Sequence, residues 1–312
     1  MQIIFNQTVV MFILIVTGII CFKTGIITKA GNKELSKLVL SVVNPLVIFM
    51  AYQEKEYNSE LVKNLLIAFA ISLISFIIVI AFAYILIPMK ENRNREIERF
   101  SVIYSNCGFM GIPLIQAVLG STGVFYLTAY LTVFNFAIWT HGIILLSGEK
   151  NLKNVLKVLY SPVILSIVLG VILFFLNIKL PSIISEALNF IGNLNTPLAM
   201  IVAGVTIADT NILNLLKKKR IYYVSIVKLF IIPALITILL ALPVLPDIDS
   251  EVRIAIIIAV SAPSATMCTL QCIRLGKDSL YASEIFAFTT VFSILSLPLV
   301  IQFDQIANNL LK

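Results

Sequence analysis

Apolar residues occur along this chain in runs of about 20, the length that a helix needs to cross a hydrocarbon core of about 30 Å. Short polar breaks separate these runs, and the division predicts ten transmembrane helices. The predicted spans cover residues 3–22, 36–53, 62–87, 100–119, 122–147, 158–177, 187–208, 221–244, 253–274 and 279–302. We therefore expect an all-α membrane protein whose main partner is the lipid bilayer.

Composition agrees with this division. Hydrophobic residues make up 59% of the chain and charged residues only 12%, whereas a soluble domain has about 25% charged residues. The run that begins at Ile3 has no Lys or Arg before it and lysines after it, the reverse of a signal peptide, so it is expected to be a retained first helix. The four cysteines fall inside predicted spans, which favours packing over disulfides. We expect no water-soluble domain.

The net charge of +7 is explained by topology rather than by nucleic acid, because no aromatic-interleaved basic stretch occurs. Most of the 23 lysines and arginines fall in the connections after the odd-numbered spans. These are Lys23, Lys29, Lys33, Lys37, Lys90, Arg93, Arg95, Arg99, Lys150, Lys153, Lys157, Lys217, Lys218, Lys219, Arg220, Arg274 and Lys277. Loops that stay in the cytoplasm carry such an excess, so both termini are predicted to be extracytoplasmic in a cell membrane.

Several short motifs occur once in each half of the chain. Asn44-Pro45-Leu46 in the second span is echoed by Thr196-Pro197-Leu198 in the seventh, and Pro113 in the fourth by Pro263 in the ninth. Because each half holds five spans, the second half must be inverted relative to the first. This predicts a first repeat at 1–147, a cytoplasmic linker at 148–157 and a second repeat at 158–312.

The chemistry is expected where two helices are interrupted. The fourth span carries Gly108, Gly111 and Pro113 near its middle, and the ninth carries Pro263 among small and hydroxyl residues. Proline removes a helical hydrogen bond, and an interrupted helix in lipid must face protein or a water-lined cavity. Crossed broken helices 4 and 9 would direct half-helix N-termini at a carboxylate. The alternative is that each proline only kinks its helix.

Polar side chains at the same depth are the expected lining of a binding site. They are Asn44, Asn106, Gln116, Asn135, Ser264, Thr266 and Gln271, together with Gly111, Pro113 and Pro263. For each polar residue taken singly, an interhelical hydrogen bond is the competing explanation.

Three residues with charged or basic side chains lie well inside predicted spans, away from their ends. His141, Lys228 and Glu284 are each expected about 9–11 Å below the cytoplasmic boundary. Because an intramembrane charge needs a partner, Lys228 and Glu284 are predicted to pair. His141 titrates near neutral pH and is a candidate for proton coupling, although a packing role is the competing interpretation.

Other classes of function lack the residues that they require. No Asp or Glu lies near either predicted break, which weakens direct ligation of sodium. No phosphate-binding loop, zinc motif or nucleophile elbow occurs, so we expect neither an enzyme nor a cofactor or metal site.

The segments SNCGFMGIP at 105–113, SAPSAT at 261–266, Asn44-Pro45-Leu46 and NFAIWTHG at 135–142 resemble the auxin efflux carrier family, whose bacterial members include malate permeases. The resemblance covers essentially the whole chain. It implies a ten-helix inverted-repeat carrier, similar in architecture to bile-acid symporters and sodium/proton antiporters, with substrate at Pro113 and Pro263 beside Asn135. The plant members called PIN proteins have a long central loop, which this chain lacks.

The expected function is therefore secondary transport of a small organic anion, such as malate or another carboxylate, or an auxin-like compound, by alternating access. The first, second and fifth spans and their repeats would move against the crossed helices. The alternatives are a cation or proton antiporter of the same architecture and a non-transporting membrane sensor or scaffold. Family analogy also suggests a homodimer.

Overall fold

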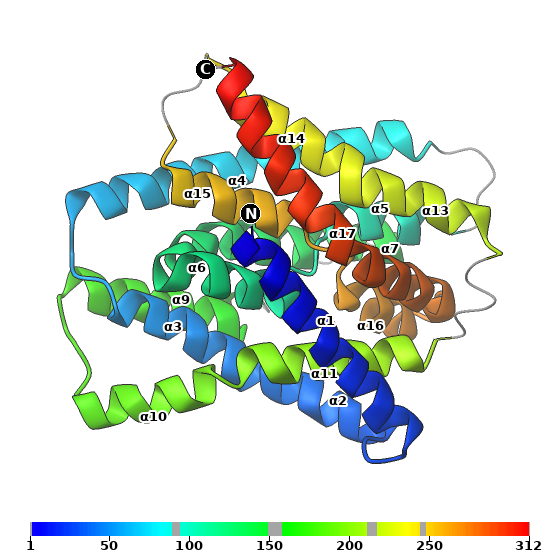
Figure 1. Cartoon of the computed structure of the whole chain (residues 1–312), viewed down its shortest axis with the longest axis horizontal. Helices are drawn as coiled ribbons and strands as arrows, with labels where there is room; N and C mark the ends of the chain where they lie inside the picture. Colours follow the sequence, from blue (N-terminus) through cyan, green and yellow to red (C-terminus); the bar gives the residue numbers. More distant parts are fainter. Residues whose placement is uncertain (1, 89–93, 149–157, 211–216, 244–247, 312) are drawn as a thin grey trace.

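The computed structural model describes residues 2–88, 94–148, 158–210, 217–243 and 248–311, and these residues form helices joined by short connections (Figure 1). The predicted linker therefore lies outside the described residues, apart from Gly148. The first half holds α1 (Gln2–Lys23), α2 (Lys29–Leu38), α3 (Asn44–Gln53), α4 (Ser59–Leu86), α5 (Arg95–Ile103), α6 (Ile112–Ala137) and α7 (Ile143–Ser147). The second half holds α9 (Pro162–Phe175), α10 (Ser182–Gly192), α11 (Asn195–Ala208), α13 (Lys219–Ile226), α14 (Ile232–Ala241), α15 (Ser250–Ser261), α16 (Thr266–Arg274) and α17 (Ser279–Leu311).

Seven helices of the described residues are long and apolar enough to cross a membrane, so this is a multi-pass membrane protein. Large apolar side chains on the outside of α4, such as Leu66, Ile77 and Ile85, are exposed, as a lipid-facing surface requires. The count of ten spans stays a prediction. The longest apolar helix, Cys107–Ser147, is sharply kinked at Gly120, whose φ of 63° suits glycine, and predicted spans four and five meet there.

Three prolines follow wide π-helical turns instead of breaking their helices. The turns η1 (Val39–Val43), η2 (Cys107–Gly111) and η4 (Val227–Ile231) each end just before an X-Pro step. Proline clashes with the carbonyl four residues before it, and widening the preceding turn relieves that clash. The prediction of a break at Pro113 is therefore wrong in position, because Pro113 lies in the first turn of α6.

The interruptions lie at Tyr104–Asn106, before η2, and at Ala262–Ala265, between α15 and α16. Pro263 belongs to the second interruption, as its sequence predicts. The two interrupted segments come from opposite halves of the chain and contact each other, as described below.

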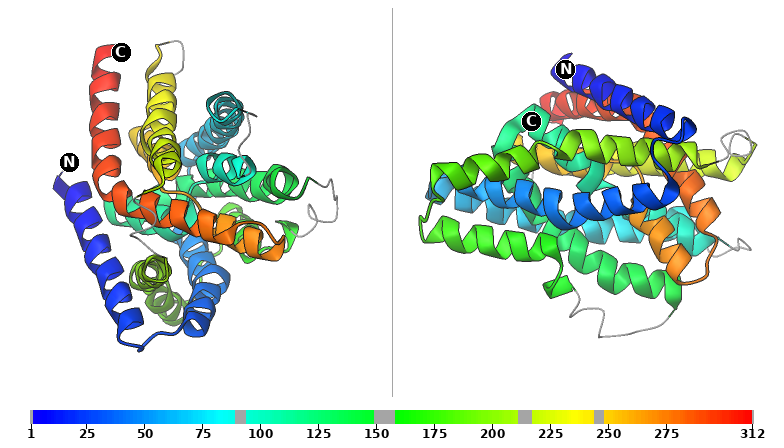
Figure 2. Two further views of the ribbon diagram at one scale, coloured as in Figure 1. Left: turned by 90° about the vertical axis from the view of Figure 1, so that its right-hand side faces the viewer. Right: turned by 90° about the horizontal axis from the view of Figure 1, so that it is seen from below.

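The helices form two groups. The frame helices are α1, α2, α3, α9, α10 and α11, and the crossing helices are α4, α5, α6, α7, α13, α14, α15, α16 and α17. In Figure 1, α2, α3, α10 and α11 lie in the lower half and α4, α13, α14 and α15 in the upper half, with α6 between them. The right-hand view of Figure 2 shows the rows α10–α11, α2–α3 and α9 side by side.

Glycines allow the closest contacts within the frame helices. A Cβ on Gly204 of α11 would lie 2.0 Å from the Ile15 carbonyl oxygen, and one on Gly18 of α1 would lie 2.3 Å from that of Ile201. A Cβ on Gly170 of α9 would lie 2.6 Å from a ring atom of Tyr52 in α3. Helix α6, which contains the first part of the fifth predicted span, packs most extensively on α4 and α15, but it also contacts α3, where the Tyr52 hydroxyl is 2.6 Å from Thr128 Oγ1.

Candidate functional site

Backbone hydrogen bonds join the two interruptions. The Asn106 N–H donates to the Pro263 carbonyl at 2.6 Å, and the Ala265 N–H donates to the Tyr104 carbonyl at 2.9 Å. These bonds enclose an antiparallel bridge between Ser105 and Ser264. Both segments leave their helices here. Each therefore supplies hydrogen bonds to backbone groups of the other that would be unpaired in an apolar interior.

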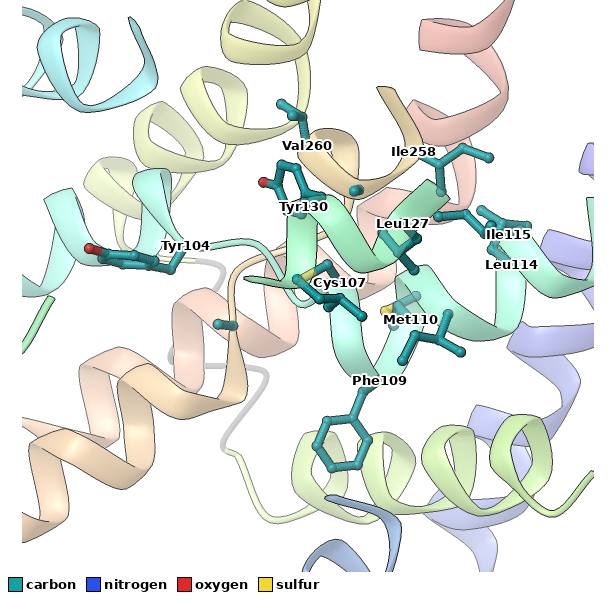
Figure 3. Close-up of a cluster of buried hydrophobic side chains, with 14 of the residues drawn as sticks. Tyr104, Cys107, Phe109, Met110, Leu114, Ile115, Leu127, Tyr130, Ile258 and Val260 are labelled. Atoms are coloured by element: carbon teal, nitrogen blue, oxygen red, sulfur yellow. The ribbon is translucent and has the colours of Figure 1, made fainter. Parts of the chain in front are cut away.

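Apolar side chains surround this crossing. Figure 3 shows Cys107 and Met110 of η2 among Leu127 and Tyr130 of α6, with Val260 of α15 beside Tyr130. All of these side chains are buried. The crossing itself is therefore tightly packed.

The half-helices that start at the crossing have no side-chain caps. Asn106 precedes η2 and Ala265 precedes α16, and neither provides a capping hydrogen bond. The first amides of such a helix carry partial positive charge and are a ready site for an anion.

Buried amide side chains at the start of η2 and at the starts of α3 and α11 are incompletely paired. The Asn44 Nδ2 donates to the Gly108 carbonyl at 3.3 Å, but its Oδ1 finds no partner among the described residues. The same holds for Asn106 Nδ2 and for both amide atoms of Asn195, at the start of α11. Unsatisfied buried polar atoms cost about 1–3 kcal/mol each, so hydrogen-bonding capacity is concentrated here. Asn195 was not predicted, although it precedes Thr196-Pro197 much as Asn44 precedes Pro45.

A cavity of about 250 Å³ lies between the frame helices and the crossing helices. Its wall from α3 is apolar and includes Val47, Met50 and Ala51. Polar groups come from Gln116 and Ser121 of α6 and from Asn189 and Asn193 at the end of α10, and Glu54 is at the end of α3. Gln116 is the one predicted lining residue that contributes to this cavity.

Two lysines lie near this cavity. The Lys55 Nζ donates to Thr122 Oγ1 at 2.5 Å, next to the cavity residue Ser121. The Lys179 Nζ donates to the Gln53 carbonyl at 2.5 Å, and partial burial lowers the pKa of Lys179 while the nearby Glu56 opposes that shift. Together they offset the carboxylate of Glu54 at this end of the cavity.

Several predicted lining residues are engaged elsewhere. The Asn135 Nδ2 donates to the Leu131 carbonyl one turn earlier, and the Gln271 Nε2 is 3.8 Å from the sulfur of Met267 in its own helix. Ser264 Oγ donates to the Ser101 carbonyl at 2.9 Å. Gly111 is buried and closes η2, while Thr266 is half-buried and opens α16. These positions support the crossing or their own helices, and none of them lines the cavity.

The predicted pair between Lys228 and Glu284 is wrong. Glu284 is buried and accepts from Lys218 Nζ at 2.7 and 2.5 Å, whereas Lys228 donates to two backbone carbonyls. Lys218 was assigned to a loop, but its long side chain reaches the carboxylate from the start of α13.

A second buried carboxylate was not predicted. Glu98 of α5 accepts from Arg220 in a bidentate pair, with the shortest bond 2.8 Å, and from the Tyr281 hydroxyl at 2.8 Å. The sequence treats Arg95 and Arg99 as loop residues, so Glu98 between them gave no signal of burial. Within the described ranges, no group of three or more His, Cys, Asp or Glu side chains is placed to hold a metal ion.

His141 contacts the first interruption through a tyrosine. Its Nδ1 is 2.9 Å from the Tyr104 hydroxyl, which also donates to the Ala137 carbonyl at 2.8 Å, and its Nε2 is 3.3 Å from the Tyr84 hydroxyl. Since the Tyr104 proton is given to the carbonyl, the hydroxyl accepts from Nδ1–H, and Tyr84 can donate to Nε2. A neutral imidazole satisfies all of these contacts.

A family model described as "Membrane transport protein" matches residues 3–301. The match confirms the resemblance to the auxin efflux carrier family that the sequence motifs indicate. The chain is also 22% identical over 292 residues to an "uncharacterized transporter" of Methanothermobacter thermautotrophicus, covering 92% of this chain and 94% of that protein.

Proposed function

This chain belongs to the membrane transport protein family, and we propose that it is a secondary carrier that moves a small organic anion, such as malate or another carboxylate, by alternating access. The observation that carries the proposal is the cavity between the frame helices and the crossing helices. A solute held between two helix groups can be exposed to either side when one group moves against the other. The fifth predicted span would then move with the crossing helices, on which it packs.

The chemistry around the cavity supports an anion with an apolar part. Amides and a hydroxyl from Gln116, Asn193 and Ser121 can donate to carboxylate oxygens, and the α3 wall suits a carbon skeleton. Lys55 and Lys179 lie nearby and offset the carboxylates of Glu54 and Glu56. Deeper in the protein, the uncapped start of η2 and the unpaired Asn106 amide are suited to receive the charge as the helices move.

We also propose the inverted repeat, with repeats at 1–147 and 158–312. It is supported by the reciprocal pairing of the interruptions and by the glycine contacts, because α1 packs closely on α11 through Gly18 as α9 packs on α3 through Gly170. The connections predicted to be cytoplasmic flank helix ends that lie toward the right of Figure 1, such as the starts of α5 and α13. This arrangement supports extracytoplasmic termini in a cell membrane.

The test is a thermal-unfolding screen of the purified protein in detergent against malate, lactate, indole-3-acetate and sodium chloride. We expect one carboxylate to raise the unfolding midpoint, and we expect Gln116→Ala and Asn193→Ala to reduce that response. Asn135→Ala is the matched control, since its amide donates within its own helix and should leave the response intact. Stabilisation by sodium alone would contradict anion binding and favour the antiporter.

A proton-coupled mode is a second candidate, favoured by the contact of His141 with Tyr104 at the first interruption. In proteoliposomes, His141→Gln would then flatten the pH dependence of carboxylate uptake, while Glu284→Gln tests a buried carboxylate. An unchanged pH profile in both variants would remove protons as the coupling ion.

A further inference from the structure

Lys228 is buried beside the crossing and has an unusual set of partners. Its side chain is 1% exposed, and its Nζ donates to the Val102 carbonyl at 3.2 Å and to the Val260 carbonyl at 3.3 Å. No ion pair with Lys228 occurs among the described residues. A buried ammonium that contacts only neutral groups needs an explanation, because desolvation strongly disfavours it.

The two carbonyls have equivalent positions. Val102 is the penultimate residue of α5, which ends at Ile103, and Val260 is the penultimate residue of α15, which ends at Ser261. The last carbonyls of a helix lack intrahelical partners and carry partial negative charge. Two such ends converge on the crossing, so the local backbone field favours a cation between them.

Two carbonyl oxygens are the bonded partners of the ammonium, and the narrow gap beside it is bordered mostly by apolar side chains such as Phe76, Val79 and Ile232. Ser75 and Tyr130 border the same narrow gap as Lys228, and Ser75 Oγ has no hydrogen-bond partner among the described residues. The gap leaves no room for a water molecule. A free ion therefore has no space beside the ammonium.

The helix that carries Lys228 is adapted locally. Lys228 lies in the wide π turn η4, which precedes Pro233 in the first turn of α14. Wide turns of this kind move the following side chains out of regular helical register. The turn thus places one lysine where it reaches both half-helices.

We infer that the ammonium of Lys228 is a built-in cation that holds the carbonyl ends of α5 and α15 together at the crossing, in a position that an exchangeable monovalent cation would otherwise occupy. The lysine is a positioning residue, which acts through the backbone of the two half-helices. The consequence is a carrier whose crossing is stable without sodium. This inference concerns the crossing and does not depend on which anion, if any, is carried.

The experiment measures thermal unfolding of the purified protein in choline, sodium, lithium and potassium chloride at constant ionic strength. Lys228→Gln and Lys228→Met remove the cation, and Lys63→Met is the control because it removes an exposed lysine from α4. The wild type and the control should have the same midpoint in all four salts. The Lys228 variants should unfold at lower temperature in choline and recover at least half of the loss in sodium or lithium.

Three results would overturn the inference. They are a sodium-dependent midpoint in the wild type, a Lys228→Gln midpoint in choline equal to that of the wild type, and a loss in both variants that no cation reverses. The wild-type salt series still tests the inference if both variants fail to fold, because a sodium-dependent midpoint would contradict it. Anion-induced stabilisation of the wild type is measured separately, so failure of this inference is distinct from failure of the carrier proposal.

Discussion

The contact between α1 and α11 provides a sharp test of the frame. In Gly204→Ala the new Cβ would lie 2.0 Å from the Ile15 carbonyl oxygen and 2.9 Å from its carbon. Because the obstacle is helix backbone, no side-chain rotation can relieve it, and the two helices must separate by about 1 Å. Overpacking costs about 3 kcal/mol at the upper end of its usual range, while alanine regains about 1 kcal/mol of helix propensity. The free energy of unfolding is therefore expected to fall by about 2 kcal/mol.

Thermal unfolding in detergent measures this loss, which corresponds to a fall of about 4 °C in the midpoint. Gly31→Ala in α2 is the matched control, because its Cβ would meet nothing closer than Thr28 Oγ1 at 3.5 Å. The control should be unchanged or slightly more stable. A Gly204→Ala protein as stable as the control would refute the close packing of α1 on α11.

Two further predictions concern buried charges. Arg220→Met should destabilise the protein by about 3 kcal/mol, more than Glu98→Gln, because it leaves a fully buried carboxylate without its bidentate partner, whereas the half-exposed arginine can turn to solvent. Urea unfolding measures the free energy of unfolding of both variants. A larger loss in Glu98→Gln than in Arg220→Met would contradict this prediction. Asp304→Asn should lower the free energy of unfolding by about 3 kcal/mol. The side chains of Asp304 and Arg253 are both about 95% buried, so the guanidinium would keep its charge without a counter-ion. A thermal midpoint within 1 °C of the wild type would show that this pair contributes little.

The sequence predicts those features that depend on composition and local chemistry. Apolar runs with few charges require helices in a bilayer, because lipid offers the backbone no hydrogen-bond partners. The fourth predicted span ends at residue 119, and the structure has its kink at Gly120, whose positive φ suits a residue without a Cβ. Pro263 lies in an interruption, as its missing N–H predicts. The motifs around these residues were also sufficient to indicate the family.

The tertiary structure decides what depends on distant partners. Pro113 has the same chemistry as Pro263, yet its helix continues through a wide turn, while the chain breaks at Tyr104–Asn106, where the Pro263 carbonyl and the Ala265 N–H supply hydrogen bonds. Among the residues that the structure describes, Lys228 has no carboxylate partner, and its ammonium contacts the ends of two helices instead. Helix propensity and charge are properties of single segments, whereas these outcomes depend on which backbone and side-chain groups the fold brings within hydrogen-bonding distance.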